Sequence, residues 1–135
     1  MTIQLPRAQA EKLLASIKGR AAKYRNQKVE GYDADGNVIT FDSKKEARRW
    51  GELLALQRQG LISQLQRQVT FVFGEDNRSV RYKSKKSVRY VVDFMYHDGR
   101  DLIYEDVKSP ASKTHAYKIK WALMKYFFGI EVQEV

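Results

Sequence analysis

One stretch in the C-terminal half limits the possible folds of this chain most. Residues 90–96 read YVVDFMY, residues 97–100 read HDGR, and residues 101–108 read DLIYEDVK. Two runs rich in aromatic and β-branched residues, separated by a glycine-containing turn, predict an antiparallel hairpin. Because side chains alternate between the two faces of a strand, Asp106 and Lys108 should project on the same side.

The first strand of this hairpin carries Asp93, and two registers bring it near Asp106. If Tyr96 pairs with Asp101, the two carboxylates are diagonal; if Asp98 pairs with Asp101, they are directly opposite. Either register leaves them roughly 5–8 Å apart at Cβ. Two carboxylates and a lysine are costly to bury without a ligand, and a hard divalent cation such as Mg²⁺ is the simplest one. The alternative is a solvated edge hairpin with a weak surface ion pair.

Composition narrows the class of protein. The 135 residues suit one domain with a real core. The absence of cysteine excludes disulfides and thiolate metal sites, and two histidines argue against a histidine-rich zinc site. No apolar run is long enough to span a membrane and no signal-peptide pattern is seen, so we expect a cytoplasmic protein without a membrane partner. The net charge of +9 favours a polyanion, nucleic acid above all, although simple solubility also accounts for it.

The N-terminal third divides into an arm and the start of a domain. Residues 6–24 show a basic helical pattern with an apolar stripe, so residues 1–28 are predicted to form a basic helix or arm ahead of a domain at 29–135. This arm is either a DNA contact or a solvated helix with one docked face. Residues 29–41 predict a hairpin that turns at 35–37.

A helix is predicted from Ser43 to Arg58. Ser43 and Glu46 fit a capping box, in which Glu46 would reach back to the helix start. The helical wheel, however, places Glu46 beside the apolar arc that contains Trp50 and Leu53, where a carboxylate could reach a site between helix and sheet. We favour the role of ligand over that of cap.

Polar and basic segments follow this helix. Gly60 suits a helix C-terminus, and residues 60–73 predict a strand or an extended lead into one, in which Gln68 either lines the site or is simply exposed. Residues 74–87 are charged and rich in turn residues, so they form either a phosphate-contacting loop or a solvated one. The candidate phosphate contacts there are Arg81, Lys83, Lys85 and Lys86.

The last predicted helix covers residues 112–128 and is closed by Gly129, with a final strand at 130–135. Its wheel groups Ala116, Ile119, Leu123 and Phe127 on one side, with Lys120 near the centre of the apolar arc. A lysine in that position either extends its ammonium to solvent or lines a site for an anion, and a phosphate is the anion we expect.

The ordered set of blocks resembles the PD-(D/E)XK, or restriction-endonuclease-like, nuclease superfamily. The blocks are FDSKKEARR at 41–49, GLI and LQRQ between 60 and 68, YVVDF at 90–94 and EDVKS at 105–109. They resemble more narrowly a family of small phage and prophage nuclease-like proteins, over roughly residues 24–135. The chain differs from the commoner pattern in having Val92 before Asp93, where proline is usual, and Asp106, where glutamate is frequent.

This resemblance implies an α/β fold with a restriction-endonuclease-like mixed β-sheet flanked by helices. It implies that Glu46, Asp93, Asp106 and Lys108 are catalytic, and that Asp93, Asp106 and the Val107 carbonyl hold Mg²⁺, with Glu46 directly or through water. Mn²⁺ should substitute for Mg²⁺. Lys108 would position or help to deprotonate the attacking water.

The implied function is metal-dependent endonucleolytic hydrolysis of DNA in phage recombination, replication or processing, in a bacterial host cytoplasm. The partner expected is DNA, and a homodimer is compatible with the sequence. The alternative is a non-catalytic DNA-binding or phage assembly protein on the same fold. RNA as substrate and the number of metal ions stay open, but the inward-facing acidic residues favour the enzyme because they would repel the phosphates of a merely bound strand.

Overall fold

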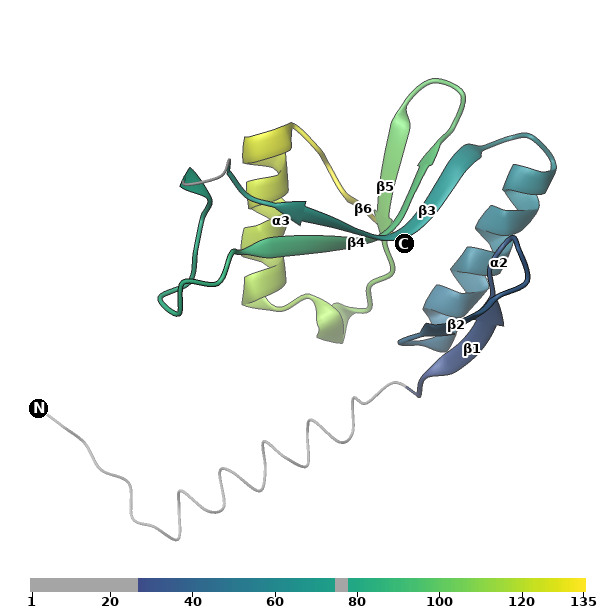
Figure 1. Ribbon diagram of the computed structural model, residues 1–135, viewed down its shortest axis with the longest axis horizontal. Coiled ribbons are helices and arrows are strands. Elements are labelled where there is room, and N and C mark those ends of the chain that lie inside the picture. The colour runs from purple at the N-terminus through teal and green to yellow at the C-terminus, as the bar shows by residue number, and fades with distance from the viewer. Residues whose placement is uncertain (1–26, 75–77) are drawn as a thin grey trace, which may run out of the picture.

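A computed structural model describes residues 27–74 and 78–135 (Figure 1). The predicted helix at 6–24 lies outside the described residues, as do residues 75–77 of the basic loop and most of the predicted arm. The described part is a mixed α/β structure with a small antiparallel sheet of β1 (Val29–Tyr32) and β2 (Val38–Phe41). A four-stranded mixed sheet follows the order β3-β4-β5-β6.

The larger sheet contains β3 (Ser63–Val72), β4 (Arg89–His97), β5 (Leu102–Asp106) and β6 (Gln133–Glu134). The pairings β3–β4 and β4–β5 are antiparallel, and β5–β6 is parallel. The two strands of the predicted hairpin are therefore the central members of this sheet, as the apolar runs indicated. The predicted hairpin at 29–41 is also confirmed, whereas the final strand is shorter than predicted.

Helix α2 (Lys44–Arg58) forms where the sequence predicts it. Ser43 has an extended backbone, and its Oγ accepts the Glu46 N–H at 3.1 Å. Gly60, with a φ of +77°, closes the other end, where its N–H donates to the Gln57 carbonyl. The helix thus has a sequence-encoded start and stop.

The hairpin register is the tighter of the two expected ones. His97 pairs with Leu102 and Phe94 with Glu105. The Asp98 N–H donates to the Asp101 carbonyl at 3.1 Å, and this bond closes a two-residue loop. Continued by one residue, the same register places Asp93 directly across from Asp106.

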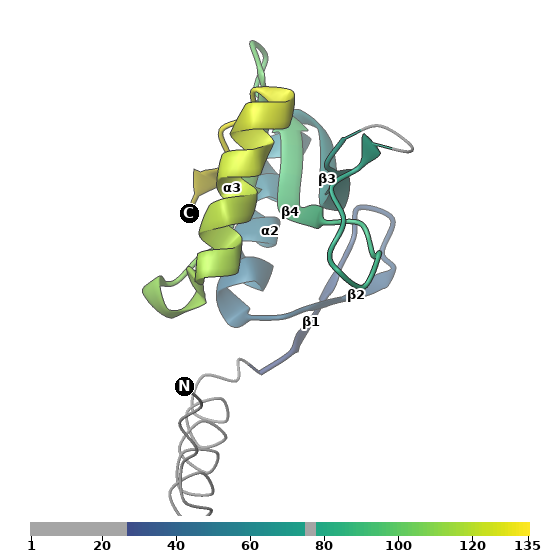
Figure 2. The same ribbon diagram turned by 90° about the vertical axis from the view of Figure 1, so that its left-hand side faces the viewer.

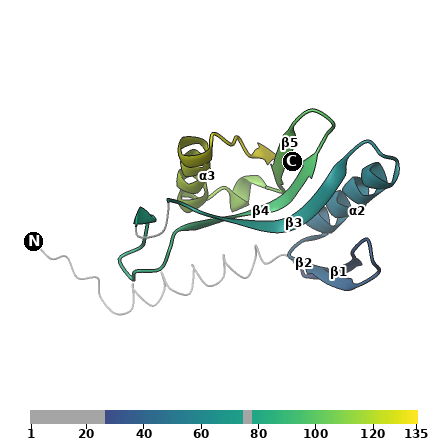
Figure 3. The same cartoon turned by 45° about the horizontal axis from the view of Figure 1, so that its top comes forward.

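Strand β4 contributes to two separate hydrophobic cores. Its even-numbered residues from Tyr90 to Tyr96 are buried. Tyr90 and Val92 belong to the cluster that contains Met124 of α3 (His115–Phe128), whereas Phe94 and Tyr96 belong to the cluster that contains residues of α2. In Figures 1 and 3, α3 and α2 accordingly lie toward opposite ends of the β3–β4 ladder. Asp93 falls where the strand passes from one core to the other.

Helix α3 begins later than predicted and presents a different face. A 3₁₀ turn, η2 (Pro110–Ser112), precedes it, and Thr114 is the N-cap, whose Oγ1 accepts the Tyr117 N–H at 3.1 Å. Met124 is buried, while Ile119 is 62% exposed, so the apolar arc predicted from the wheel is rotated. The reason is that Tyr117 and Trp121 pack toward β4 and β6; Trp121 Nε1 donates to the Val132 carbonyl at 2.9 Å. Figure 2 shows α3 running alongside β4.

Lys120 therefore does not lie at the centre of the buried face. It is partly exposed, one residue before Trp121, at the edge of the contact between α3 and β4. Within the described residues, no helix combines the length and apolar character needed to cross a membrane.

Candidate functional site

Asp93 and Asp106 are joined by two bonds that cross between their strands. Asp106 Oδ1 accepts the backbone N–H of Asp93 at 3.0 Å, and Asp93 Oδ2 accepts the backbone N–H of Val107 at 2.9 Å. Asp106 is only 2% exposed. The side chains thus replace ordinary ladder bonds at the point where β4 and β5 separate. The sequence correctly predicted that these two carboxylates would meet.

Glu46 reaches the same place from α2. Its side chain is buried, and no hydrogen bond from the Ser43 N–H to its carboxylate is found among the described residues. Instead, Gln68 Nε2 lies 3.3 Å from Glu46 Oε1 and 3.4 Å from Asp93 Oδ1. Ser43 caps the helix, while the Glu46 carboxylate belongs to the acidic group, so the two halves of the predicted capping box have separated.

Gln68 connects Glu46 to Asp93 from an unusual backbone conformation. Its φ is +54°, in the left-handed region that non-glycine residues rarely adopt. Such strain persists where the surrounding structure imposes it, and it concentrates at functional sites. The sequence suggested Gln68 as a polar lining residue from strand alternation alone; it gave no sign of this conformation.

Lys108 lies just beyond β5 and beside α3. Its Nζ is 4.5 Å from the centroid of the Tyr117 ring, a cation–π contact. Its backbone is fixed as well, since its N–H donates to the Val135 carbonyl and its own carbonyl accepts Lys45 Nζ at 3.0 Å. The ammonium forms no ion pair with either aspartate within the described residues.

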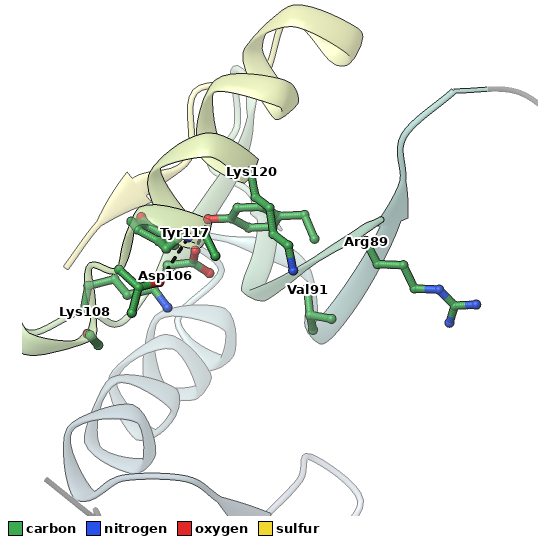
Figure 4. A pocket seen from close by; sticks show the side chains of 10 residues that line it. Arg89, Val91, Asp106, Lys108, Tyr117 and Lys120 are labelled. Atoms are coloured by element: carbon green, nitrogen blue, oxygen red, sulfur yellow. Dashed lines mark hydrogen bonds between the residues drawn. The ribbon is translucent and has the colours of Figure 1, made fainter. Parts of the chain in front are cut away.

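Two cavities meet at Lys108. One, of about 230 Å³, lies between the start of α2 and the end of β5, and Glu46, Asp93, Val107 and Lys108 all line it. The other, of about 330 Å³, lies between β4 and the first half of α3. Asp106, Lys108 and Lys120 line this second cavity, which Figure 4 shows. The predicted catalytic and metal-binding residues are therefore shared between two adjoining hollows.

The acidic group carries more negative charge than its surroundings compensate. Burial, with the nearby Asp93 charge second, raises the pKa of Glu46 to about 7. Burial also raises the pKa of Asp93 to about 6, against the Val107 N–H, which lowers it. The pKa of Asp106 is raised too, mainly by burial. Raised carboxylate pKa values of this kind are typical of sites that accept a cation or a proton.

The donor set fits a hard divalent cation held by few protein ligands. Within residues 27–74 and 78–135, no three acidic or imidazole side chains converge closely enough to form a metal cluster on their own. Mg²⁺, however, commonly takes one or two carboxylates and keeps several waters. Asp93, Asp106 and the Val107 carbonyl, which accepts no hydrogen bond from the described residues, supply such a set. Glu46 then suits a contact through water.

Sequence reasoning missed the residues that support this group. The Tyr90 hydroxyl donates to Asp106 Oδ2, and burial together with this bond raises the pKa of Tyr90. Tyr117 positions the Lys108 ammonium, and Lys45 holds the Lys108 carbonyl. An aromatic residue or lysine gives no sequence signal for such a role, because each is equally typical of a core or a surface.

The predicted basic loop lies apart from the acidic group. Arg81, Lys83, Lys85 and Lys86 are exposed on a small hairpin in which Arg81 pairs with Ser87, and Arg81 Nη1 donates to the Lys85 carbonyl at 2.9 Å. None of the four lines either cavity.

The fold and site define a mixed α/β protein with a buried carboxylate pair at the centre of its sheet, next to a lysine held by an aromatic ring. The chain belongs to the family described as Protein of unknown function (DUF1064), which matches residues 21–133. No curated protein and no solved structure matches the chain.

Proposed function

We propose that this protein is a metal-dependent endonuclease that hydrolyses phosphodiester bonds in DNA. The observation that carries the proposal is the reciprocal pair Asp93–Asp106, with Glu46 and Lys108 lining the same cavity as Asp93. Burial of this much acidic charge is hard to explain as structure alone, because no arginine or lysine among the described residues forms an ion pair with it.

The order of elements supports the finer assignment of a restriction-endonuclease-like fold. Helix α2 carries the first acidic residue, β4 and β5 carry the aspartates, Lys108 lies two residues beyond β5, and α3 and β6 follow. This is the order expected from the resemblance. The parallel pairing of β6 with β5 makes the sheet mixed, as that fold requires.

The residues can be given roles from their contacts. Asp93, Asp106 and the Val107 carbonyl would hold Mg²⁺, which when bound acidifies a water and stabilises negative charge on phosphate. Gln68 holds the Glu46 and Asp93 carboxylates, so that Glu46 can accept a proton or hydrogen bond from the attacking water. Lys108, once released from the Tyr117 ring, can donate to a phosphate oxygen and neutralise the charge that develops there.

DNA is the proposed substrate because the chain is strongly basic and the site suits phosphate chemistry. The net charge of +9 attracts a polyanion despite the acidic group. Mn²⁺, which also prefers oxygen ligands, should support the same reaction.

Nicking of a supercoiled plasmid tests the proposal. The protein is incubated with Mg²⁺, with Mn²⁺ and with EDTA, beside an Asp106→Asn variant purified in the same way. We expect nicking that needs the metal and is absent from the variant. If the wild-type protein leaves plasmid, linear duplex, branched DNA and RNA intact under all these conditions, the enzymatic proposal is wrong.

A non-catalytic nucleic-acid-binding module is the second candidate. It is favoured by the hydrogen bonds that Asp106 already accepts at both carboxylate oxygens, from the Asp93 N–H and from the Tyr90 hydroxyl. Binding of DNA by the wild-type protein, with no cleavage by any metal and with unchanged affinity on adding Mg²⁺, would support this candidate over the enzyme.

A further inference from the structure

The cavity between β4 and the first half of α3 has a lining that suits an anion. Its charged side chains are the cations Arg89, Lys108 and Lys120 and one acid, Asp106. The ion pairs found among the described residues use other cations, so these three have no acidic partner there. Ser112 and Thr114 add hydroxyl groups to the wall.

The side chains divide into an inner pair and an outer residue. In Figure 4, the Lys120 side chain extends from α3 toward Val91, and Lys108 lies near Asp106. The Arg89 guanidinium points away from the cavity, so Arg89 marks its rim. Lys108 contacts the Tyr117 ring and also lines the cavity that contains Glu46 and Asp93, whereas Lys120 lines only the cavity beside α3.

Tyr117 also leaves a polar group without a partner. Its hydroxyl oxygen is buried near the Tyr90 hydroxyl, but no hydrogen bond of ordinary geometry joins it to the described residues. A buried hydroxyl is costly to leave unpaired, so we expect a small movement of the side chain to pair it with a ligand oxygen or with the Tyr90 hydroxyl. The tyrosine ring lines the cavity, which places this need next to the two lysines.

We propose that this cavity is a subsite for the phosphodiester next to the one cleaved, bound by Lys120 with the Tyr117 hydroxyl and by Arg89 at the rim. The inference rests on the proposed function for its substrate class. The subsite would give the protein a second contact with the DNA strand, beside the contact at the carboxylate pair. Because Lys108 lines both this cavity and the one that contains Glu46 and Asp93, a DNA strand bound in the subsite would continue toward the carboxylate pair.

The test measures binding without cleavage. The affinity of a short labelled DNA duplex is measured in EDTA over a range of salt concentrations for the full chain and for Lys120→Ala, Arg89→Ala and Lys118→Ala. Lys118 is the matched control because it is an exposed lysine two residues earlier in α3, about 200° away around the helix. We expect the slope of log K against log salt to become less negative by about one for Lys120→Ala, less for Arg89→Ala, and not for Lys118→Ala.

Tyr117→Phe separates a ligand contact from a structural role. The variant keeps the ring under Lys108 and removes an unpaired hydroxyl, so its melting temperature should stay the same or rise. We nevertheless expect Tyr117→Phe to bind the DNA duplex several-fold more weakly than the wild-type protein does. Unchanged affinity in both Tyr117→Phe and Lys120→Ala would overturn the subsite.

The outcomes separate this inference from the proposed function. Loss of affinity in the Lys120 variant with no cleavage by the wild-type protein would support the subsite and refute the nuclease. If the wild-type protein cleaves DNA but Lys120→Ala and Lys118→Ala bind it with the same affinity, only the subsite is refuted. A free nucleotide is the other source of the same chemistry: saturable binding of 5′-deoxyadenosine monophosphate that depends on Lys120, with duplex affinity unaffected, would also overturn it.

Discussion

Asp93 and Asp106 each accept a backbone N–H from the other's strand, at 2.9 Å from Val107 and at 3.0 Å from Asp93 itself. Neither carboxylate can change rotamer without losing a backbone bond at the centre of the sheet. The pair is therefore held rigid before any ligand arrives. Preorganisation of this kind is what a metal site or an anionic transition state requires.

Replacing Asp93 or Asp106 by asparagine should remove the carboxylate charge and keep the hydrogen-bond geometry. An asparagine oxygen can still accept the backbone N–H, so Asp93→Asn and Asp106→Asn should fold. We expect cleavage to fall by about a hundred- to a thousandfold, the scale on which loss of one electrostatic contact acts. DNA affinity in EDTA should stay equal or increase, because one negative charge near phosphate is removed.

Single-turnover cleavage and equilibrium binding measure these two effects separately. Asp101→Asn is the control, since Asp101 is exposed in the turn of the same hairpin and its carbonyl, not its side chain, makes the closing bond. Wild-type cleavage by either site variant would contradict the assignment.

Ser43 and Glu46 should fail in different ways when replaced. Ser43→Ala removes the oxygen that accepts the Glu46 N–H, so it should cost about 1 kcal/mol of stability and leave cleavage at temperatures well below melting near normal. Glu46→Gln removes a buried charge with a raised pKa, so it should preserve or raise the melting temperature. Its cleavage should fall by orders of magnitude.

Thermal melting and cleavage rates of both variants check this separation. The result that would return Glu46 to a capping role is a Glu46→Gln protein that melts earlier but cleaves like wild type.

Replacement of Glu105 should affect stability, whereas replacement of its neighbour Asp106 should affect cleavage. Glu105 is 2% exposed and is bound by Arg49 through two bonds, at 2.7 and 2.9 Å, and by the Tyr96 hydroxyl at 2.5 Å. Removing one member of a buried pair typically costs roughly 3–5 kcal/mol. The partial exposure of Arg49 places Glu105→Gln at the lower end of that range.

Chemical denaturation measures this cost, with Asp106→Asn as the matched variant one residue along. We expect Glu105→Gln to be the less stable protein and to retain metal-dependent cleavage under conditions where it is folded. A stable but inactive Glu105→Gln protein would move the site to the other face of β5.

The local elements could be predicted from the sequence because their signals are local. Ser43 and Gly60 delimit α2, and the aspartate-rich turn after His97 sets the hairpin that brings Asp93 to Asp106. The rotated face of α3 could not be predicted from its wheel, because nearly all its sides carry apolar residues. The choice of face depends on contacts outside the helix, such as the bond from Trp121 Nε1 to the Val132 carbonyl just before β6. Proline and serine at 110–112 also delayed the start of that helix.

The contacts that support the site from distant parts of the sequence could not be predicted either. The left-handed backbone conformation of Gln68 has no signal in the residues that surround it in the sequence. Tyr90 contacts Asp106, which lies 16 residues away in the sequence. Tyr117 contacts Lys108, which lies 9 residues away. Each looks like an ordinary core tyrosine in the sequence.

The metal-free protein should lose stability as the pH rises through neutrality. The pKa of Glu46 is raised from an ordinary 4.5 to about 7 and that of Asp93 from 3.8 to about 6. The folded state therefore binds these protons more tightly than the unfolded state. The resulting stability is fully present below the unfolded pKa values and is lost as pH rises through the folded ones.

In EDTA, we expect the melting temperature to fall between about pH 5 and pH 8. The double variant Glu46→Gln, Asp93→Asn should remove most of that slope. Adding Mg²⁺ should raise the melting temperature of the wild-type protein more at pH 8 than at pH 5, because a cation binds the ionised carboxylates and competes with protons for them. Differential scanning fluorimetry across this range measures all three effects. A wild-type protein whose melting temperature rises steadily from pH 5 to pH 8 in EDTA would show that the acidic group is compensated by charges other than a bound cation.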